Sequence, residues 1–454
     1  MIVLKFGGTS VGSAQRIRSV ADIITKVPGR KIVVLSAMSG TTDALVHLSS
    51  LLYRGLFEEA HSAVDTLKAK YETVIEELFD EDELRAKARI MLFPIFEELK
   101  AQTHNDAFTV NDEKRILSKG EIISVQLMLL TVQRYHGIVP SHLNSLHFMK
   151  INHEGEPEQH YIRKNISSLV AANSNKGHLF IAEGYICLNA FGEIDNLRRG
   201  GSDYTATLIG EAVDADEIQI WTDIDGLHNN DPRIVNVTSP VRRLHFGEAT
   251  ELAHFGAKIL HPTCIEPARR SNITVKLLYT LDPSARGTTI SGETGNATVK
   301  AVSAKDGIVV LTAHPHPELN STTSLADIIF SISQILVKRG IKADHISSNG
   351  QSILMAIEES GDLEGLIQEL KGFCSVDVQY GMTMLAVVGA MSWDRIGFES
   401  KILEALDDIP LRLISYGSSN YSLVLAVAAE DKKRAMIALS DHLFRHLSLS
   451  VEIG

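Results

Sequence analysis

The sequence predicts an α/β protein, in which a central, largely parallel sheet between helices is followed by two smaller α/β units. The first observation is that short apolar runs alternate with longer amphipathic runs through the N-terminal two-thirds of the 454 residues. The second is a repeat near the C-terminus, where the Ser-Ser-Asn turn at 347–349 returns at 418–420. This spacing of about 71 residues fits one small α/β unit and is too long for a solenoid repeat.

The N-terminal segments define the pattern. A strand is predicted over Ile2–Phe6, a turn over Gly7–Gly12 and a helix over Ala14–Lys26. The same order returns with a strand over Lys31–Leu35, a small-residue turn over Ser36–Thr42 and a second helix. Because strands that alternate with helices favour parallel pairing, these segments predict the centre of a parallel sheet.

Later segments extend this plan. Buried strands are predicted over Gly177–Ile181 and Glu217–Trp221, and residues 55–135 are mostly helical in pattern, which favours a covering layer or lid. In the last third, apolar residues at helical spacing over 325–336 precede two short strand patterns. A similar order follows near residue 402, which supports a repeated unit.

A polar, glycine-containing run over 290–297 predicts a domain boundary. We therefore expect a catalytic domain over 1–295, a first regulatory unit over 296–375 and a second over 376–454. The strand predicted near 300–312 is expected either to stay with the first unit or to pack with the second.

Composition excludes several classes of protein. The formal charge of −12 argues against a general nucleic-acid binder. The three cysteines, Cys187, Cys264 and Cys374, are widely spaced and odd in number, which excludes a disulfide framework and fits a reducing compartment. No apolar run approaches the roughly 18 residues of a membrane span, and the N-terminus lacks a secretory pattern. We expect a cytoplasmic protein without nucleic-acid or membrane partners.

The turn after the first strand is a candidate phosphate site. Gly7 and Gly8 permit close backbone approach, and free N–H groups at a helix start attract anions. Lys5 lies just before them, within reach of a phosphate. The chain contains no Walker A run, so any phosphate site here is of another kind. Taken alone, this run is explained better by a simple tight turn with a solvated lysine than by a phosphate site. The turn at 36–43 either binds an anion or caps the helix that follows it.

A later stretch combines a glycine pair with charges of both signs. Arg199 is able to hold a carboxylate in a bidentate fork, which lysine cannot do. Asp203 lies at a predicted helix start and is either a site residue or only an N-cap. The glycine pair at 200–201 beside these charges favours a binding site.

Two further runs follow predicted elements. Trp221–Arg233 comes after a strand and so lies at a strand's carboxyl end, where open α/β sheets bind ligands. Its Asp-Gly and Asp-Pro pairs are also ordinary turn dipeptides, which leaves Arg233 unexplained. Lys258 follows Gly256, the expected end of a helix, where a lysine is commonly only a dipole partner. No metal site is expected in the histidine-rich stretch at 142–160, because ligand spacing is absent.

In combination and in this order, the motifs resemble those of the aspartokinases of the amino-acid kinase family. The runs that carry the resemblance are Lys5–Val11, Gly120-Glu121, Arg199–Tyr204, Trp221–Arg233, Glu248–Ala253 and Phe255–Pro262. The likeness covers the first strand to about Ile290, and the C-terminal repeat is similar to that family's paired ACT domains, which are ferredoxin-like βαββαβ units. The layout is most similar to the monofunctional, lysine-sensitive type.

The resemblance implies an ATP-dependent aspartate kinase, which transfers the γ-phosphoryl group of MgATP to the β-carboxylate of L-aspartate, the first step towards lysine, threonine and methionine. It implies Lys5 and Asp203 as catalytic residues. The implied substrate contacts are Thr42, Glu121, Arg199 and Ser202. The implied ATP contacts are Lys5, Phe6, Gly7, Gly8, Thr222, Asp223, His228, Arg233 and Lys258. ATP and Mg²⁺ are the implied cofactors, and no particular Mg²⁺ ligands are implied.

The resemblance also implies regulation and assembly. An amino-acid effector is expected at the ACT units, and a homodimer or larger assembly is expected because ACT units usually pair across subunits. The candidate effector contacts are Asp344, Ile328, Ile329, Ser348 and Asn349. Departures from the family pattern around these positions argue against feedback inhibition by lysine.

Two alternatives remain open. The first is an amino-acid sensor with a degenerate kinase domain, and the one feature in its favour is Asp195–Arg198, where family members commonly carry Thr-Thr-Leu-Gly. The second is a kinase for another acidic amino acid, glutamate or N-acetylglutamate. A further departure is His228, where tyrosine is frequent, so the adenine contact differs from the family pattern.

Overall fold

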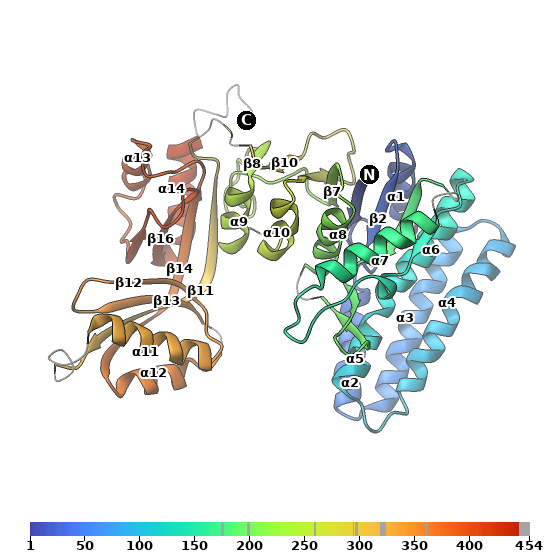
Figure 1. Cartoon of the computed structure of the whole chain (residues 1–454), viewed down its shortest axis with the longest axis horizontal. Helices are drawn as coiled ribbons and strands as arrows, with labels where there is room; N and C mark the ends of the chain where they lie inside the picture. The colour runs from blue at the N-terminus through green and yellow to red at the C-terminus, as the bar shows by residue number, and fades with distance from the viewer. Residues whose placement is uncertain are drawn as a thin grey trace.

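A central sheet of eight strands forms the core of the catalytic part (Figure 1). The computed structural model describes residues 1–173, 177–197, 200–257, 260–293, 295, 298–317, 324–359 and 361–444. The strand order is β3-β4-β2-β1-β7-β9-β10-β8, and the neighbours pair in parallel except for the antiparallel β9 and β10. These strands are β1 (Ile2–Phe6), β2 (Lys31–Leu35), β3 (Ser141–Leu143), β4 (Leu179–Glu183), β7 (Glu217–Thr222), β8 (Arg243–His245), β9 (Thr274–Tyr279) and β10 (Thr288–Ser291). The predicted α/β class with a largely parallel sheet is confirmed.

Helices cover both faces of this sheet. Side chains alternate along each strand, so Val3 and Leu4 of β1 enter different buried clusters. One face carries α1 (Ala14–Lys26), α2 (Thr41–Tyr53), α3 (Phe57–Leu78), α4 (Asp82–Gln102), α5 (Val110–Leu117) and α6 (Lys119–His136). The other carries α7 (Gln159–Ala172), α8 (Gly201–Ala212), α9 (Phe246–His254) and α10 (Pro262–Arg270). All residues of β2 and β4 are buried, as expected for strands covered on both faces.

The bounds of the first elements agree closely with the sequence pattern. The first strand, the first helix and the second strand match their predicted ranges, while β4 begins two residues later than expected. Helix α2 begins at Thr41, inside the predicted turn, because Gly40 adopts a φ of 73° and ends the turn early. A short hairpin of β5 (Ile186–Leu188) and β6 (Ile194–Asn196) was not expected from the sequence.

One helical stretch is apolar enough to resemble a membrane span. Among the described residues, Val110–His136, which comprises α5 and α6, is long and apolar enough to cross a membrane by length and composition alone. No such run was expected from the sequence. Its most apolar window is 72% buried inside the protein. Ile123, Val125 and Leu127 of α6 belong to the core between the helices and the sheet, so this stretch is a core helix of the catalytic part.

The C-terminal part is a second sheet, with the order β12-β13-β11-β14-β16-β15 and antiparallel pairing throughout. Its strands are β11 (Ala301–Pro315), β12 (Ala343–Ser348), β13 (Ile353–Glu358), β14 (Cys374–Val388), β15 (Leu413–Ser415) and β16 (Ser422–Ala428). Helices α11 (Leu325–Lys338) and α12 (Leu363–Lys371) cover one core, and α13 (Phe398–Glu404) and α14 (Lys432–Phe444) cover another. The long strands β11 and β14 pair along their length and extend through both units, so the boundaries near 295 and 375 stay predictions.

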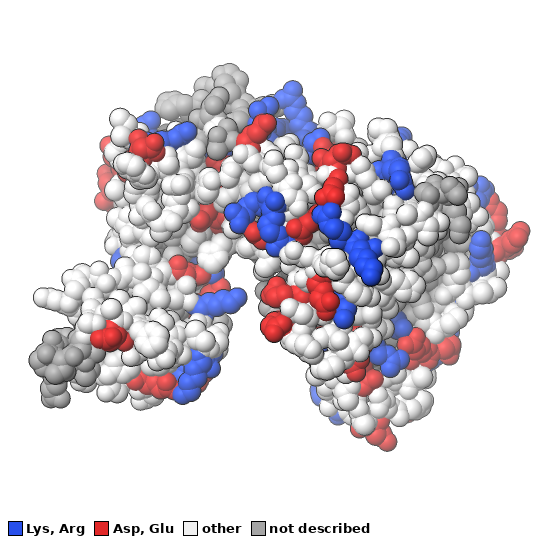
Figure 2. Space-filling model, in the orientation of Figure 1, with Lys and Arg blue, Asp and Glu red and all other residues white. Residues whose placement is uncertain are grey.

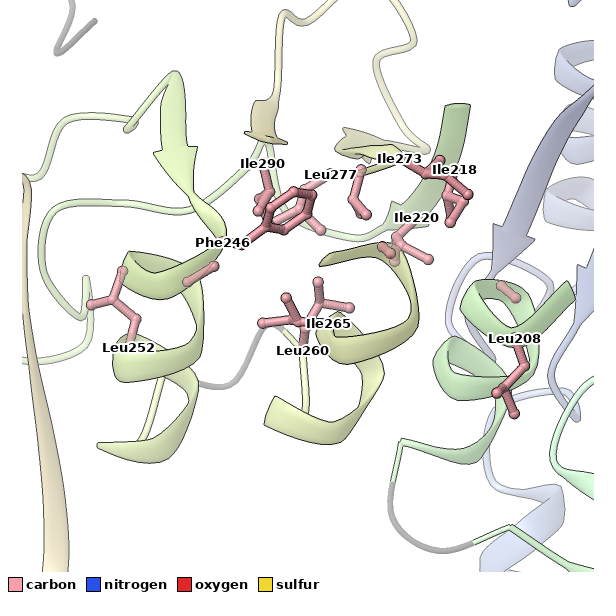
Figure 3. Packing of buried hydrophobic residues seen from close by; sticks show 14 of the residues in the cluster. Leu208, Ile218, Ile220, Phe246, Leu252, Leu260, Ile265, Ile273, Leu277 and Ile290 are labelled. Carbon is pink, nitrogen blue, oxygen red and sulfur yellow. The ribbon is translucent and has the colours of Figure 1, made fainter. Parts of the chain in front are cut away.

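Helices α9 and α10 connect the two parts (Figure 1). Figure 3 shows Phe246 of α9 and Ile265 of α10 directed towards Leu277 and Ile290 beneath the sheet edge. On its other side α9 contacts the C-terminal sheet. There the Lys300 Nζ lies 2.8 Å from the Glu248 Oε2, and both side chains are almost completely buried.

This buried pair generates a stability prediction. Lys300→Met should lower the free energy of unfolding by about 3–5 kcal/mol, because it leaves the Glu248 carboxylate buried without its partner. The double variant Glu248→Leu/Lys300→Met should recover most of the loss. Chemical denaturation of the full chain measures both.

Glu266→Ala is the matched control. It breaks the Arg269–Glu266 pair, whose side chains are 55% and 41% exposed, so a change below about 1 kcal/mol is expected. A comparably small change for Lys300→Met would contradict a stabilising role for the buried pair.

Candidate active site

Two loops at the carboxyl edge of the central sheet are held against each other. The Ser36 N–H donates to the Phe6 carbonyl at 3.2 Å, and the Ser39 N–H donates to the Gly8 carbonyl at 3.1 Å. A Cβ atom at Gly8 would lie 2.7 Å from the carbonyl oxygen of Ala37, so only glycine permits this approach. The predicted glycine turn is therefore fixed by tertiary contact as well as by its local sequence.

Lys5 and Asp203 form an ion pair across this edge. The Lys5 Nζ lies 2.7 Å from the Asp203 Oδ1, and the two side chains are only 11% and 15% exposed. Asp203 lies in the first turn of α8, and the N-cap is Gly200, with a φ of 75° and no side-chain cap. Asp203 is therefore not the N-cap, and its carboxylate instead positions the lysine. Ser202, beside it, packs so tightly that a Cβ at Gly184 would lie 2.5 Å from the Ser202 Oγ.

Glu121 lies in the first turn of α6, and its side chain is buried close to this pair. It accepts a hydrogen bond from the Ala37 N–H at 3.2 Å. Burial raises the pKa of Glu121 to about 8, although the Ala37 N–H and the Lys5 ammonium both favour its ionised form. The nearby Glu183 carboxylate raises it further. A cationic ligand group placed here would convert a largely neutral acid into a buried carboxylate.

The sequence analysis did not identify Glu183 as a site residue. It ends β4, is 1% exposed, and accepts a hydrogen bond from the Ser145 N–H at 2.9 Å. Its other oxygen lies 2.5 Å from the His142 Nε2. The available signal was a charged residue directly after a buried strand, in the run Ile181-Ala182-Glu183. Among the described residues, no group of three or more His, Cys, Asp or Glu side chains is arranged to hold a metal ion.

The remaining predicted substrate residues, Thr42 and Arg199, differ in whether the structure describes them. Thr42 is exposed at the start of α2, whereas its neighbour Thr41 is fully buried, with its hydroxyl 2.8 Å from that of Tyr71. Of these two threonines, Thr42 is the one accessible to a ligand. Arg199 lies outside the described residues, as does Lys258.

The departure at 195–198 is partly explained by β6. The Asp195 carboxylate lies 2.6 Å from the Lys114 Nζ of α5, and Asn196 donates to the Lys114 carbonyl at 3.4 Å. These contacts attach the hairpin to the helical layer. Arg198 lies outside the described residues.

A cavity of about 670 Å³ opens beyond the carboxyl ends of β7 and β9. Asp223, His228 and Arg233, three of the predicted nucleotide contacts, line it. The volume is within the roughly 300–1,000 Å³ of small-molecule sites. Phe6 and Gly7 border the same edge, because β1 pairs with β7 and the Gly7 N–H donates to the Trp221 carbonyl at 3.3 Å. The cavity and the Lys5 turn thus lie on neighbouring strands.

Side chains on the cavity wall are held in fixed orientations. The His228 ring nitrogens lie 2.7 Å from the Thr238 Oγ1 and 2.7 Å from the Asp225 Oδ1. Arg233 forks onto Asp231, with its Nε 2.9 Å from Oδ1 and its Nη2 2.6 Å from Oδ2. These bonds from Arg233 hold the pKa of the Asp231 carboxyl below its usual value. The wall therefore presents an oriented imidazole and a guanidinium, which is 68% exposed.

The predicted effector residues do not form one open pocket. Ile328 is buried in the core beneath α11, and Ser348 and Asn349 are exposed at the end of β12. The Asp344 side chain is 4% exposed and lies 2.6 Å from the Lys305 Nζ and 3.0 Å from the His254 Nε2. Burial raises the pKa of Asp344, but its bonds to Lys305 and His254 outweigh burial and lower that pKa overall.

Ile329 is half-buried and packs against the Ile328 core. Asn349 uses its Oδ1 to accept the N–H groups of Gln351 and Ser352, which closes a turn. In this arrangement the Asp344 carboxylate is already neutralised by the protein.

Charged groups of both signs are mixed across the visible face of the molecule, which is hollowed between the C-terminal sheet and the catalytic part (Figure 2).

Comparisons with known proteins agree with this geometry. The amino acid kinase family profile matches residues 1–278, and an ACT domain profile matches residues 385–443. The lysine-sensitive aspartokinase 3 of Escherichia coli K12 is 30% identical over 458 residues, which cover 98% of this chain and 99% of that protein. The structure of E. coli aspartokinase III in complex with aspartate and ADP (R-state) gives a TM-score of 0.83 at 29% identity, over 98% of this chain and 100% of that one. Its complex with lysine and aspartate (T-state) gives 0.76 at 30% identity, over 98% and 99%.

The close loop approach generates a second prediction. Gly8→Ala should destabilise the protein by about 1–3 kcal/mol, because the new Cβ meets backbone that cannot rotate away. Gly7→Ala is the matched control, since its Cβ would lie 3.5 Å from the Lys5 Nζ, an ordinary van der Waals distance. Thermal denaturation compares the two, and equal losses would contradict a specific constraint at Gly8.

Proposed function

The chain belongs to the aspartokinases of the amino acid kinase family, and we propose that it transfers the γ-phosphoryl group of ATP to the β-carboxylate of L-aspartate in the site around Lys5. The observation that carries this assignment is the cluster of Lys5, Asp203 and Glu121 beside the glycine turn. It provides a cation for a phosphate and a buried acid for an ammonium group. The higher TM-score with the aspartate and ADP complex than with the lysine complex supports a substrate-competent arrangement.

Catalysis in this proposal consists of alignment and charge stabilisation. Aspartate presents an ionised carboxylate as its nucleophile, so no general base is required. Lys5 neutralises charge on the moving phosphoryl group, and Asp203 holds the Lys5 ammonium in place. The Gly8 N–H is the proposed contact to phosphate oxygens at the turn, whereas the Gly7 N–H already donates to the Trp221 carbonyl and Gly7 contributes close backbone approach.

Aspartate is held by groups that match its three charges. Glu121 takes the ammonium group, Arg199 forks onto a carboxylate, and Ser202 and Thr42 donate hydrogen bonds. The assignments of Arg199 and Thr42 rest on their positions in the family motifs.

The nucleotide extends from the Lys5 turn into the cavity. Phe6, Thr222, Asp223, His228, Arg233 and Lys258 are the proposed ATP contacts. His228 is already oriented by Asp225 and Thr238 and offers a flat ring where family members commonly carry tyrosine. Mg²⁺ fits this site, because Asp223 and Asp225 place carboxylate oxygens on the cavity wall. Phosphate oxygens and water supply its other ligands.

Regulation and assembly are also part of the proposal. Phe330 and Val337 on α11 are 63% and 80% exposed, and such apolar side chains support a homodimer or larger assembly through this helix. An amino-acid effector at the ACT units is proposed by analogy with the lysine complex of the E. coli enzyme.

We also place the protein in the cytoplasm, because its three cysteines are unpaired and buried.

A sensor with a degenerate kinase domain is not favoured, because the charged groups of the site remain in contact. One assay tests the proposal directly. Purified protein with MgATP and L-aspartate should form an acyl phosphate that hydroxylamine traps as aspartyl hydroxamate. Trapping with glutamate or N-acetylglutamate instead would identify another acidic substrate, and no hydroxamate from folded protein would reject the proposal.

In the same assay Lys5→Ala should lower kcat by about 100-fold or more, because charge on the transferring phosphoryl group is no longer neutralised. Lys26→Ala, at the exposed end of α1, is the control and should retain full activity. Near-normal turnover by Lys5→Ala would remove the assigned role of Lys5.

Aspartate binding should depend on pH through Glu121. The ammonium of aspartate pairs with the carboxylate form, which is the minor form below a pKa of about 8. The KM for aspartate should therefore rise roughly tenfold for each pH unit below about 8 and level off above it.

Kinetics from about pH 6 to pH 8.5 measure this dependence. Glu121→Gln cannot ionise, so its KM should be higher than that of the wild type and flat across the range. A flat wild-type profile would show that Glu121 does not titrate on aspartate binding.

A further inference from the structure

The nucleotide cavity is not built by the catalytic part alone. Two of its wall residues, Lys432 and Met436, belong to α14 at the far end of the sequence. Val302, Ser303 and Ala304 of β11 line it as well. The C-terminal unit therefore supplies one wall of a site whose other walls come from the loops after β7 and β9.

These C-terminal groups lie at the end of the cavity away from the phosphates. The phosphate turn adjoins β7, because β1 and β7 are neighbours in the sheet. From there the cavity wall continues towards the edge of the sheet. It is lined first by Asp223, which follows β7, and then by Tyr279 and Asp282, at and beyond the end of β9. The C-terminal sheet lies beyond that edge (Figure 1). A nucleotide with its phosphates at Lys5 thus directs its adenosine towards α14.

Hydrogen bonds fix the nucleotide loop to the C-terminal unit. The Val302 N–H donates to the Asn229 carbonyl at 2.8 Å, and the Asn230 Nδ2 donates to the Ser440 Oγ of α14 at 3.2 Å. Both asparagines are almost completely buried. The loop that carries His228 is therefore held directly by α14 and β11.

Apolar packing reinforces these bonds. Val235 is buried in the core of the second unit together with Met436 and Leu439, and Ile234 packs against the same core. A loop of the catalytic part thus contributes side chains to the hydrophobic core of the C-terminal unit. Met436, which borders the cavity but is only 1% exposed, is held in this shared core one helical turn after Lys432.

Lys432 carries the polar part of this wall. Its Nζ lies 2.5 Å from the Asp306 Oδ2, and its side chain is 22% exposed. It is also close enough to Asp231 to favour the ionised form of that carboxylate. Lys433, the next residue, is exposed on the outside of the same helix. Lys432 is therefore the α14 lysine with an ammonium group on the cavity wall.

We propose that α14 forms the adenosine end of the nucleotide site, with Lys432 donating hydrogen bonds to the ribose or base. This inference rests on the proposed function, because it takes the cavity as the ATP site. Lysine provides three hydrogen-bond donors on a flexible stem. Lys432 is then a positioning residue for the nucleotide and has no part in aspartate binding.

Titration of the full-length protein with ADP and with AMP tests the inference. Lys432→Ala should weaken binding of both by the same factor, about 5- to 10-fold, which is typical of the net loss of one hydrogen bond. In kinetics it should raise the KM for ATP while leaving kcat and the KM for aspartate unchanged. Lys432→Arg should restore most of the affinity, and Lys433→Ala should match the wild type.

A second variant separates direct contact from a structural role. Asp306→Asn removes the charge partner of Lys432 but keeps an oxygen for the Thr383 hydroxyl, which donates to Asp306 at 2.9 Å. If Lys432 contacts the nucleotide, Asp306→Asn should bind ADP at least as tightly as the wild type. Equal weakening by Asp306→Asn and Lys432→Ala would overturn the inference, because the ion pair alone would then be responsible.

Other outcomes are also decisive. Unchanged ADP affinity in Lys432→Ala, or a loss for ADP that exceeds the loss for AMP, would overturn the adenosine assignment. Failure of the wild-type protein to bind any nucleotide would instead reject the proposed function. The two failures are therefore distinguishable.

Discussion

The active site depends on the parallel alignment of four neighbouring strands. Because β4, β2, β1 and β7 run in the same direction, their carboxyl ends meet at one edge of the sheet. This places Glu183, the Ala37 loop, the glycine turn and Thr222 side by side. Residues that are about 30 to about 215 positions apart in the chain become one site without any local sequence signal for their proximity. The Gly8–Ala37 approach and the Lys5–Asp203 pair both require this alignment.

The charged side chains at this edge of the sheet are arranged so that each has a partner of opposite charge or a hydrogen-bond donor. The Lys5 ammonium has one carboxylate partner in Asp203 and lowers the pKa of a second, Glu121, which burial raises. Glu183 is held separately by His142 and a backbone N–H. The Lys5 and Asp203 charges therefore offset each other, and burial favours the neutral form of Glu121.

Much of this could be predicted from the sequence. The bounds of β1, α1 and β2 follow from hydrophobic period and capping, whereas the glycine turn with Lys5, taken alone, was explained better by a simple tight turn than by an anion site. The role of Asp203 could not be separated from N-capping, because the difference depends on Gly200 in a left-handed conformation. Family motifs were needed to assign Glu121, whose burial no local pattern reveals.

Other features depend on tertiary pairing. Glu183 and His142 come from different strands, and Lys432 reaches the cavity from a helix about 200 residues after the loop that it faces. The strand near 300–312 was expected, but not its continuation to Pro315. The Asp306-Gly307 pair favours a turn locally, yet the chain continues through an irregular register as one strand.

The shared strands β11 and β14 have a consequence for how the two C-terminal units evolve. Each is fifteen residues long and belongs to the sheet of both C-terminal units. A duplicated module normally can be lost or shuffled as a block, but here deletion of one unit would remove a central strand from the other. The pair must therefore evolve as a single module, and sequence drift in one unit is constrained by the packing of its neighbour.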